Sequence, residues 1–302
     1  MSAERPPTIA PQAAARWQQR LQPASPWLHE EVARRMAPRL DWIVRPPARW
    51  LHWEPLRGGL QAHALVAARY PAAGCEVRVA QPEERSRTRR ALVAPWWQPA
   101  RWRGAPQFSA QPTPGAAAML WANMALHMAA DPQALMRQWF DALAVDGFLM
   151  FSCLGPDTLR ELRALYQALG WPAPAHEYTD MHDWGDMLVA AGFAEPVMDM
   201  ERIELTFASP ERLLQELSEL GRNLHPARFP GLRGRGWREQ LHTALGRLAD
   251  PAQGGRLKLT FEIIYGHAFR PPARIAVGTE TRFSVEDFRA SLTKHKIREA
   301  GD

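Results

Sequence analysis

Cysteine is scarce in this sequence, and its scarcity excludes several classes of protein. Only Cys75 and Cys153 occur among 302 residues. They form no Cys-x-x-Cys pair, and no His/Cys group has zinc-finger spacing, so neither a disulfide framework nor a structural metal site is expected. Two such thiols are typical of a protein from a reducing compartment.

Long apolar runs are also missing. The longest mainly apolar stretch, residues 116–130, contains Asn123 and His127 and is too short to span a bilayer. Residues 1–11 are polar and proline-rich, without the apolar segment of a secretory signal. We therefore expect a soluble cytoplasmic protein that has no membrane partner.

Lysine is the third scarcity, because Lys258, Lys294 and Lys296 are the only lysines among 37 basic residues. The arginine bias is accompanied by 27 prolines, and it indicates genomic base composition more than nucleic-acid binding. We expect no nucleic-acid partner. The formal net charge of +5 favours an acidic partner without identifying one.

Strands and helices are predicted to alternate along the chain. The 46% hydrophobic content is ample for a large core. Apolar periodicity predicts strands at 50–53, 76–80, 118–122, 147–153, 197–207 and 257–269, with helices at 13–21, 27–40, 60–69, 85–91, 132–143 and 183–191. This alternation is typical of a Rossmann-like α/β fold with a mostly parallel sheet.

Two segments, 155–174 and 209–255, fall outside the alternation, and both follow the expected carboxyl end of a strand. Ligands of open α/β sheets bind at that edge. The segments are therefore expected to cover a binding crevice as a lid, or alternatively to extend the core. Leu213, Leu214, Leu217 and Leu220 have helical spacing that suits either role.

Four stretches carry a family resemblance. They are 151–163 (FSCLGPDTLRELR), 180–193 (DMHDWGDMLVAAGF), 222–226 (RNLHP) and 265–271 (YGHAFRP). They resemble the BioC family, the S-adenosylmethionine-dependent O-methyltransferases that esterify the malonyl group on acyl carrier protein in early biotin synthesis. The resemblance implies a class I methyltransferase domain at 27–271, after a flexible segment at 1–26 and before a tail at 272–302. It also implies S-adenosylmethionine as cofactor and acidic acyl carrier protein as partner.

The cofactor positions that the resemblance implies depart from the family pattern. In the first turn, residues 50–59, the pattern is acidic, x, Gly, x, Gly, x, Gly, and only Gly58 matches. His52 stands at the acidic position, and Glu54 could substitute for that acid. Pro55 and Leu56 replace glycines, and their side chains would obstruct a close approach to a nucleotide.

Three further positions are implied at the cofactor crevice. Gln81 stands where the family has its ribose-binding acid, and an amide lacks the charge-assisted strength of a carboxylate. Its neighbours Glu83 and Glu84 are expected to form an exposed turn or helix start. Asn123 and His127 match the family's Asn-x-x-x-His stretch, although a turn cap and a half-buried histidine are alternatives.

The substrate side is implied by aromatic and basic residues. Trp17 occupies the place of an aromatic that closes over the family pocket. Arg222 and Arg228 are candidates to hold the malonyl carboxylate, because a guanidinium binds a carboxylate through two bonds. Residues 232–238 (LRGRGWR) are basic enough to meet acyl carrier protein. Arginine is, however, the common polar residue throughout this chain.

Three functions remain open on the sequence. The first is O-methylation of malonyl-acyl carrier protein, a direct displacement that needs alignment and dryness rather than a nucleophilic side chain, so no catalytic residue is assigned. The second is a pseudo-methyltransferase with lost or weak cofactor binding that acts as a binding or regulatory protein. The third resembles the mitochondrial complex I assembly factor that hydroxylates a protein arginine.

Overall fold

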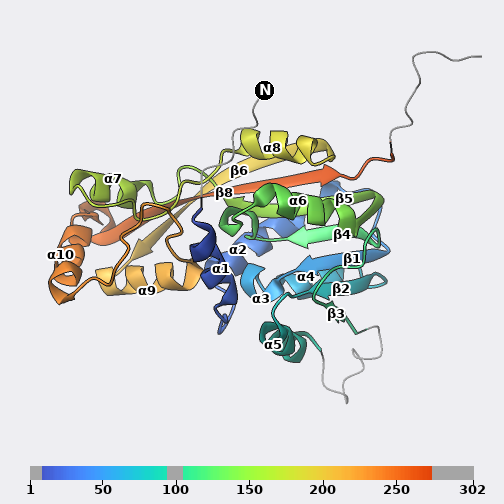
Figure 1. The fold of residues 1–302 in the computed structure, drawn as a ribbon, viewed down its shortest axis with the longest axis horizontal. Helices are drawn as coiled ribbons and strands as arrows, with labels where there is room; N and C mark the ends of the chain where they lie inside the picture. Colours follow the sequence, from blue (N-terminus) through green and yellow to red (C-terminus); the bar gives the residue numbers. More distant parts are fainter. Residues whose placement is uncertain (1–8, 94–104, 274–302) are drawn as a thin grey trace, which may run out of the picture. The chain divides into compact units, whose positions relative to one another are not determined.

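The computed structural model describes residues 9–93 and 105–273, and in these ranges one sheet of eight strands runs through the protein (Figure 1). Contacts divide the chain into Met1–Pro271 and Pro272–Asp302. Most of the expected C-terminal tail, the first eight residues of the expected N-terminal segment and part of the expected loop at 96–114 lie outside the described residues.

The sheet has the mostly parallel order predicted from the sequence. Five parallel strands are followed by two long strands that pair antiparallel. Across the sheet the order is β3 (Gln107–Ser109), β2 (Gly74–Arg78), β1 (Arg49–Trp53), β4 (Ala117–Ala122), β5 (Leu143–Leu154), β8 (Arg256–Phe269) and β6 (Ala194–Phe207), and β7 (Ala249–Asp250) pairs with β8.

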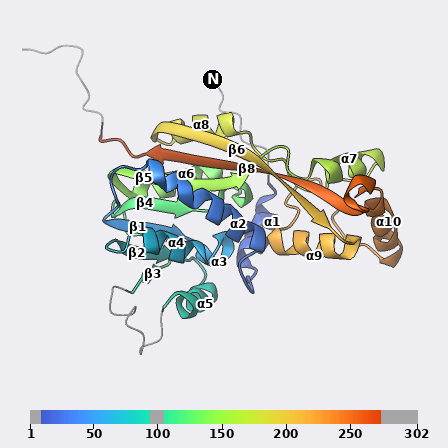
Figure 2. The same ribbon diagram turned by 180° about the vertical axis from the view of Figure 1, so that it is seen from behind.

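Helices cover both faces of the sheet. The remaining elements are α1 (Pro11–Gln19), α2 (Trp27–Met36), η1 (Ala37–Trp42), α3 (Pro55–Gly58), α4 (Ala62–Arg69), α5 (Pro82–Leu92), η3 (Leu126–Met128), α6 (Pro132–Ala142), α7 (Arg160–Ala168), α8 (Met181–Ala190), α9 (Pro210–Leu220), α10 (Arg235–Gly246) and η4 (Pro251–Gln253). In Figure 1 α6 lies in front of the strands, and Figure 2, seen from behind, shows α2 and α4 in front of them.

The core follows from the two-residue period of the strands. Trp50, Met119 and Met150 face one way and pack with α2 and α4. Leu51 and Leu149, one residue out of phase, pack on the other face with α6 and α8. Both faces are therefore dry, as expected for strands covered by helices on both sides.

Local signals at the helix ends agree with the sequence. Asp131 accepts a hydrogen bond from the Ala134 backbone N–H (2.8 Å) at the start of α6, where Pro132 is the first helical residue. Asp180 caps α8 in the same way, through the His182 N–H (2.8 Å). Gly192 ends α8 with φ of 104°, a conformation that glycine adopts without strain.

The two insertions pack on a part of the β6–β8 pair that extends past the sheet. The last β8 partner of β5 is Ile263, opposite Leu154, but β8 continues to pair with β6 as far as Leu257. Both views show α7, α9 and α10 gathered around this extension (Figures 1 and 2). The insertions therefore extend the core, one of the two roles considered for them.

The described residues contain no helix that is both long enough and apolar enough to cross a membrane. In the same part of the chain no three His, Cys, Asp or Glu side chains gather in a way that could bind a metal ion.

The first prediction concerns the pair formed by Phe151 on β5 and Gly266 on β8, which lie opposite each other. A Cβ at Gly266 would stand 2.4 Å from Phe151 Cε1, so Gly266→Ala should destabilise the protein by about 1–3 kcal/mol through overpacking. Gly185→Ala, inside α8 with no atom within 4 Å of its added Cβ, is the matched control. It should be neutral or stabilising by up to about 1 kcal/mol. Urea unfolding of both variants checks this, and equal stabilities would contradict it.

Candidate functional site

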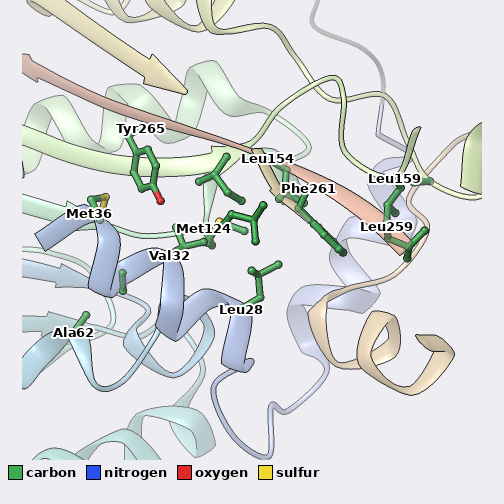
Figure 3. Packing of buried hydrophobic residues seen from close by; sticks show 14 of the residues in the cluster. Leu28, Val32, Met36, Ala62, Met124, Leu154, Leu159, Leu259, Phe261 and Tyr265 are labelled. Atoms are coloured by element: carbon green, nitrogen blue, oxygen red, sulfur yellow. The ribbon is translucent and has the colours of Figure 1, made fainter. Parts of the chain in front are cut away.

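A mainly apolar cavity of about 300 Å³ lies at the carboxyl ends of β4 and β5. Figure 3 shows Leu28 of α2, Met124 after β4, Leu154 of β5 and Phe261 of β8 converging here. The two insertions contribute further residues of the lining, namely Leu159, Leu162, Pro174, Leu217, Ser218, Leu220, Gly221, Arg222 and Asn223, and Ala175 and Tyr178 follow just after the first insertion. The insertions thus also cover a cavity, the other role considered for them, and its size is that of a small-ligand pocket.

Two buried imidazoles line this cavity. His29 on α2 bonds through Nδ1 to the Arg57 carbonyl (2.6 Å), so Nδ1 carries the proton and Nε2 is left as an acceptor. His127 Nδ1 lies 3.4 Å from the Leu154 backbone N–H, which donates to it, so the proton of His127 is on Nε2. Burial lowers the pKa of His29 to about 4 and that of His127 well below its usual value, so both rings are neutral.

Arg222 lies at the edge of the cavity and Arg228 does not line it. The Arg222 guanidinium donates to two carbonyls at the end of α9, those of Ser218 and Gly221 (2.7 Å for the second). Its side chain is exposed beyond these bonds. Arg228 instead donates to the His225 carbonyl (3.2 Å). Of the two predicted carboxylate-binding arginines, only Arg222 borders the pocket.

Trp17 is buried on α1 beside the cavity rather than in its lining. It packs with Leu224, and Met128, which lines the cavity, packs against the same cluster. The guanidinium carbons of Arg57 and Arg222 lie 5.8 and 5.9 Å from the Trp17 ring, within reach of a cation–π interaction. Trp17 therefore lies between the second insertion, which contains Arg222 and Leu224, and the turn after β1, which contains Arg57.

The turn after β1 is a short helix rather than an open loop. Pro55 and Leu56 are buried in it. Gly58 is needed for packing, because a Cβ there would stand 2.5 Å from the Asn123 carbonyl oxygen. Asn123 ties this turn to α2, since its amide donates to the carbonyls of Gly58 and His29 (2.8 Å for His29).

The acidic side chain at this turn is bonded within the protein. Glu54 has φ of 46° and accepts from the Arg78 guanidinium and the Ala80 N–H (3.0 Å for Ala80). Burial raises the pKa of the Glu54 carboxyl, and Arg78 opposes that rise. Glu54 is thereby fixed to the end of β2.

Arg57 fills the space between the ends of β1 and β2. Its guanidinium binds both oxygens of Glu84 (Nε to Oε2 3.0 Å, Nη2 to Oε1 2.7 Å). It also donates to carbonyls at the end of α1, those of Gln18 (2.9 Å) and Arg20 (2.7 Å). The Gln81 amide donates to the same Gln18 carbonyl.

Two sequence expectations need correction here. Glu84, expected on an exposed helix start, is fully buried and paired with Arg57. His52, expected at the cofactor crevice, is fully buried between β1 and α4, with Nδ1 3.3 Å from His63 Nδ1. The two-residue strand period turns His52 toward α4, on the same side as Trp50.

Sequence reasoning did not identify His29, Arg57 or Tyr178 as site residues. His29 lies within an ordinary amphipathic helix pattern, and no local spacing marks it. Arg57 is a bulky residue in a turn where the family pattern has glycines, and this mismatch is the sequence signal that could have marked it as a site residue.

A scan against models of protein families finds no match. Curated relatives named malonyl-[acyl-carrier protein] O-methyltransferase include those of Laribacter hongkongensis (38% identity over 259 residues, 82% of this chain and 84% of the relative) and Gallionella capsiferriformans (36% over 270 residues, 83% and 87%). A third, from Halorhodospira halophila, is 33% identical over 267 residues, 87% of this chain and 88% of its own. The chain belongs to this family.

Solved structures agree on the fold. The YcgJ protein of Bacillus subtilis and a putative methyltransferase of Bacillus halodurans each align with a TM-score of 0.52, at 14% and 12% identity. Each alignment covers 80% of this chain and nearly all of the other. At such identities the likeness shows the class I methyltransferase fold alone.

The family implies S-adenosylmethionine, and in this arrangement the residues at the first turn do not fit it. A nucleotide needs an open turn after β1 and a free acceptor after β2 for the ribose. Here a helical turn with buried Pro55 and Leu56 occupies the first place. In the second place, the Arg57 guanidinium and the Gln81 amide both donate to the Gln18 carbonyl at the end of α1.

The second prediction concerns pH. Burial lowers the pKa of His63 from 6.5 to about 4, so the unfolded state binds more protons between these values and stability falls as pH drops from 6.5 toward 4. For one such histidine the loss at pH 5 is about 2 kcal/mol. His63→Gln should therefore lose less stability between pH 7 and 5 than wild type does, and His182→Gln, at an exposed site, should not. Urea unfolding at both pH values checks this, and parallel losses in all three proteins would contradict it.

Proposed function

We propose that this protein is a cytoplasmic O-methyltransferase of the malonyl group on acyl carrier protein, with S-adenosylmethionine as methyl donor. One observation supports binding of the malonyl group, which accepts the methyl group. An apolar cavity of about 300 Å³ has one arginine of the predicted pair, Arg222, at its edge. The relatives named for this reaction are similar to the chain over most of its length.

The cavity suits a malonyl thioester. Leu154, Leu162 and Phe261 offer apolar surface to the thioester and the methylene next to it. A carboxylate is costly to place in such surroundings unless it is paired. Arg222 supplies the charge at the edge, where the malonyl carboxylate can lie while the rest of the group is enclosed.

The two neutral histidines offer hydrogen bonds that can orient the substrate, and they add no charge to the cavity. His29 offers an acceptor and His127 a donor, as their backbone bonds determine. An imidazolium beside the carboxylate would compete with Arg222 for it, and the low pKa of His29 prevents that at neutral pH. The pair therefore leaves Arg222 as the cation that receives the substrate.

The carrier protein is proposed to dock near residues 229–238. Arg233 stacks on Phe229 and Trp237, with its guanidinium carbon 4.3 and 4.0 Å from the ring centres. Arg235 and Arg238 are exposed, and Leu232 is fully exposed beside them. Exposed arginines around an apolar side chain suit reversible binding of an acidic protein.

The test of the function is methyl-ester formation on purified malonyl-acyl carrier protein with methyl-labelled S-adenosylmethionine. Label should appear on the malonyl carrier protein and not on the acetyl carrier protein, which lacks the second carboxylate. Absence of both methyl transfer and malonyl-carrier binding would contradict the proposal.

A second candidate is a binding protein that holds the acyl carrier protein without transferring a methyl group. The filled turn at Arg57 favours it. Calorimetric titration with S-adenosylmethionine separates the two, because low-micromolar binding would contradict the binding-only candidate. No heat at millimolar concentration would contradict the methyltransferase.

The third prediction tests the carboxylate contact. Arg222→Lys should lower kcat/KM, or the affinity for malonyl carrier protein, about tenfold to a hundredfold, because an ammonium cannot form the planar two-bond contact. Arg228→Lys is the matched control and should change neither, since Arg228 does not border the cavity. Thermal melts should match wild type in both. Equal loss in both variants would remove Arg222 from the substrate site.

The fourth prediction tests the docking surface. Replacing Arg233, Arg235 and Arg238 together by Ser should weaken carrier-protein binding and flatten its dependence on salt, because exposed charges are screened. Arg87, Arg89 and Arg90 of α5, changed together to Ser, provide a control with the same loss of charge elsewhere. Binding at low salt that is unchanged by the first triple variant would contradict the proposed surface.

A further inference from the structure

We propose that Arg57 is a latch that closes the methyl-donor site by holding α1 across the carboxyl ends of β1 and β2. The inference rests on the proposed function in one respect, that the donor is S-adenosylmethionine. It adds one step to the proposed function: α1 is released before the donor can bind.

The position of Arg57 is the first argument. The strand order β3-β2-β1-β4-β5 reverses direction between β1 and β4, and a ligand of an open α/β sheet binds at such a reversal, outside the carboxyl ends. Arg57 lies in the turn after β1, and Glu84 lies in the helix after β2. The ion pair between them therefore crosses the place where a ribose would lie.

The contacts of the guanidinium are the second argument. It forms two bonds to the Glu84 carboxylate, a geometry that fixes both partners. Nη2 is shared between Glu84 and the Gln18 and Arg20 carbonyls at the end of α1, and Nη1 points to the Trp17 carbonyl. Helix ends leave such carbonyls without partners, and a cation there is also favoured by the helix dipole. Arg57 is thus the C-terminal cap of α1 as well as a partner of Glu84.

The burial of Glu84 shows why the latch stays closed. This carboxylate is fully buried, and it also accepts the Gln22 N–H (2.9 Å) just after α1. A buried carboxylate without a partner is strongly unfavourable, so Glu84 holds Arg57 and the segment after α1 in place. The chain before α2 is therefore anchored through one buried acid.

The latch also touches the acceptor cavity. The Arg57 carbonyl accepts the proton of His29 Nδ1, and His29 lines the cavity. At its other end α1 is joined to the second insertion, where the Ala10 N–H donates to the Leu224 carbonyl (2.8 Å). Movement of α1 would thus change the contacts of Arg57 at one end of the helix and of Leu224, in the second insertion, at the other.

A closed site lowers apparent affinity by the fraction of molecules that are open. Wild type should therefore bind S-adenosylmethionine or S-adenosylhomocysteine weakly. Arg57→Met, which keeps the apolar stem and removes all the donors, should tighten binding at least tenfold. Arg16→Met changes an exposed arginine on α1 itself and should leave the affinity at the wild-type value.

Calorimetric titration with both ligands measures these affinities, and hydrogen exchange reports on α1 directly. In Arg57→Met the amides of residues 13–20 should exchange faster while those of β4 and β5 keep their protection. Faster exchange without tighter binding would overturn the latch, and so would low-micromolar binding by wild type.

Glu84→Gln provides a second variant if Arg57→Met does not fold. It keeps an acceptor for the Gln22 N–H and weakens only the pairing with Arg57, so it should tighten donor binding by a smaller factor; a folded Glu84→Gln protein with wild-type affinity would overturn the latch. Binding of malonyl-acyl carrier protein without donor is measured in parallel. If wild type neither binds malonyl-acyl carrier protein nor methylates it, the proposed function is contradicted, and the titrations that test the latch are judged separately.

Discussion

The extended antiparallel pairing of β6 with β8 is the constraint on which the rest of the site depends. Beyond Ile263 these two strands have no neighbour in β5, and the insertions pack on them instead. The cavity exists because this extension places α7 and α9 over the ends of β4 and β5. Without the extra pairing, the insertions would have no apolar surface to cover.

The turn after β1 and the cavity are joined by a short series of buried polar contacts. Asn123 binds the carbonyls of Gly58 and His29, and His29 in turn binds the Arg57 carbonyl. Buried amides and imidazoles are costly to leave unpaired, so these groups hold one arrangement. The turn that departs from the family pattern is therefore attached to the cavity through His29 and Asn123.

The fold was predictable because its signals are local. The apolar runs at 118–122 and 147–153, the Asp131-Pro132 helix start and Gly192 each act within a few residues. A family motif gave the positions of His127 and Arg222, which line the cavity, and their roles stay predictions. Glu83 and Glu84 are identical neighbours, and only the docking of α1, more than 60 residues away in sequence, decides that Glu84 is buried. His52 shows the same limit, because strand phase rather than residue type turned it toward α4.

The start of the first insertion has a consequence for how ligands enter. Glu262 of β8 accepts the Asp157 N–H (2.6 Å), and the Thr158 hydroxyl is bonded to the Glu262 backbone on both sides (3.1 and 3.2 Å). Three hydrogen bonds therefore attach the start of the first insertion to β8. We therefore expect the cavity to open at another part of its wall, formed by Gly221 and Arg222 after α9, where the Arg222 side chain is exposed.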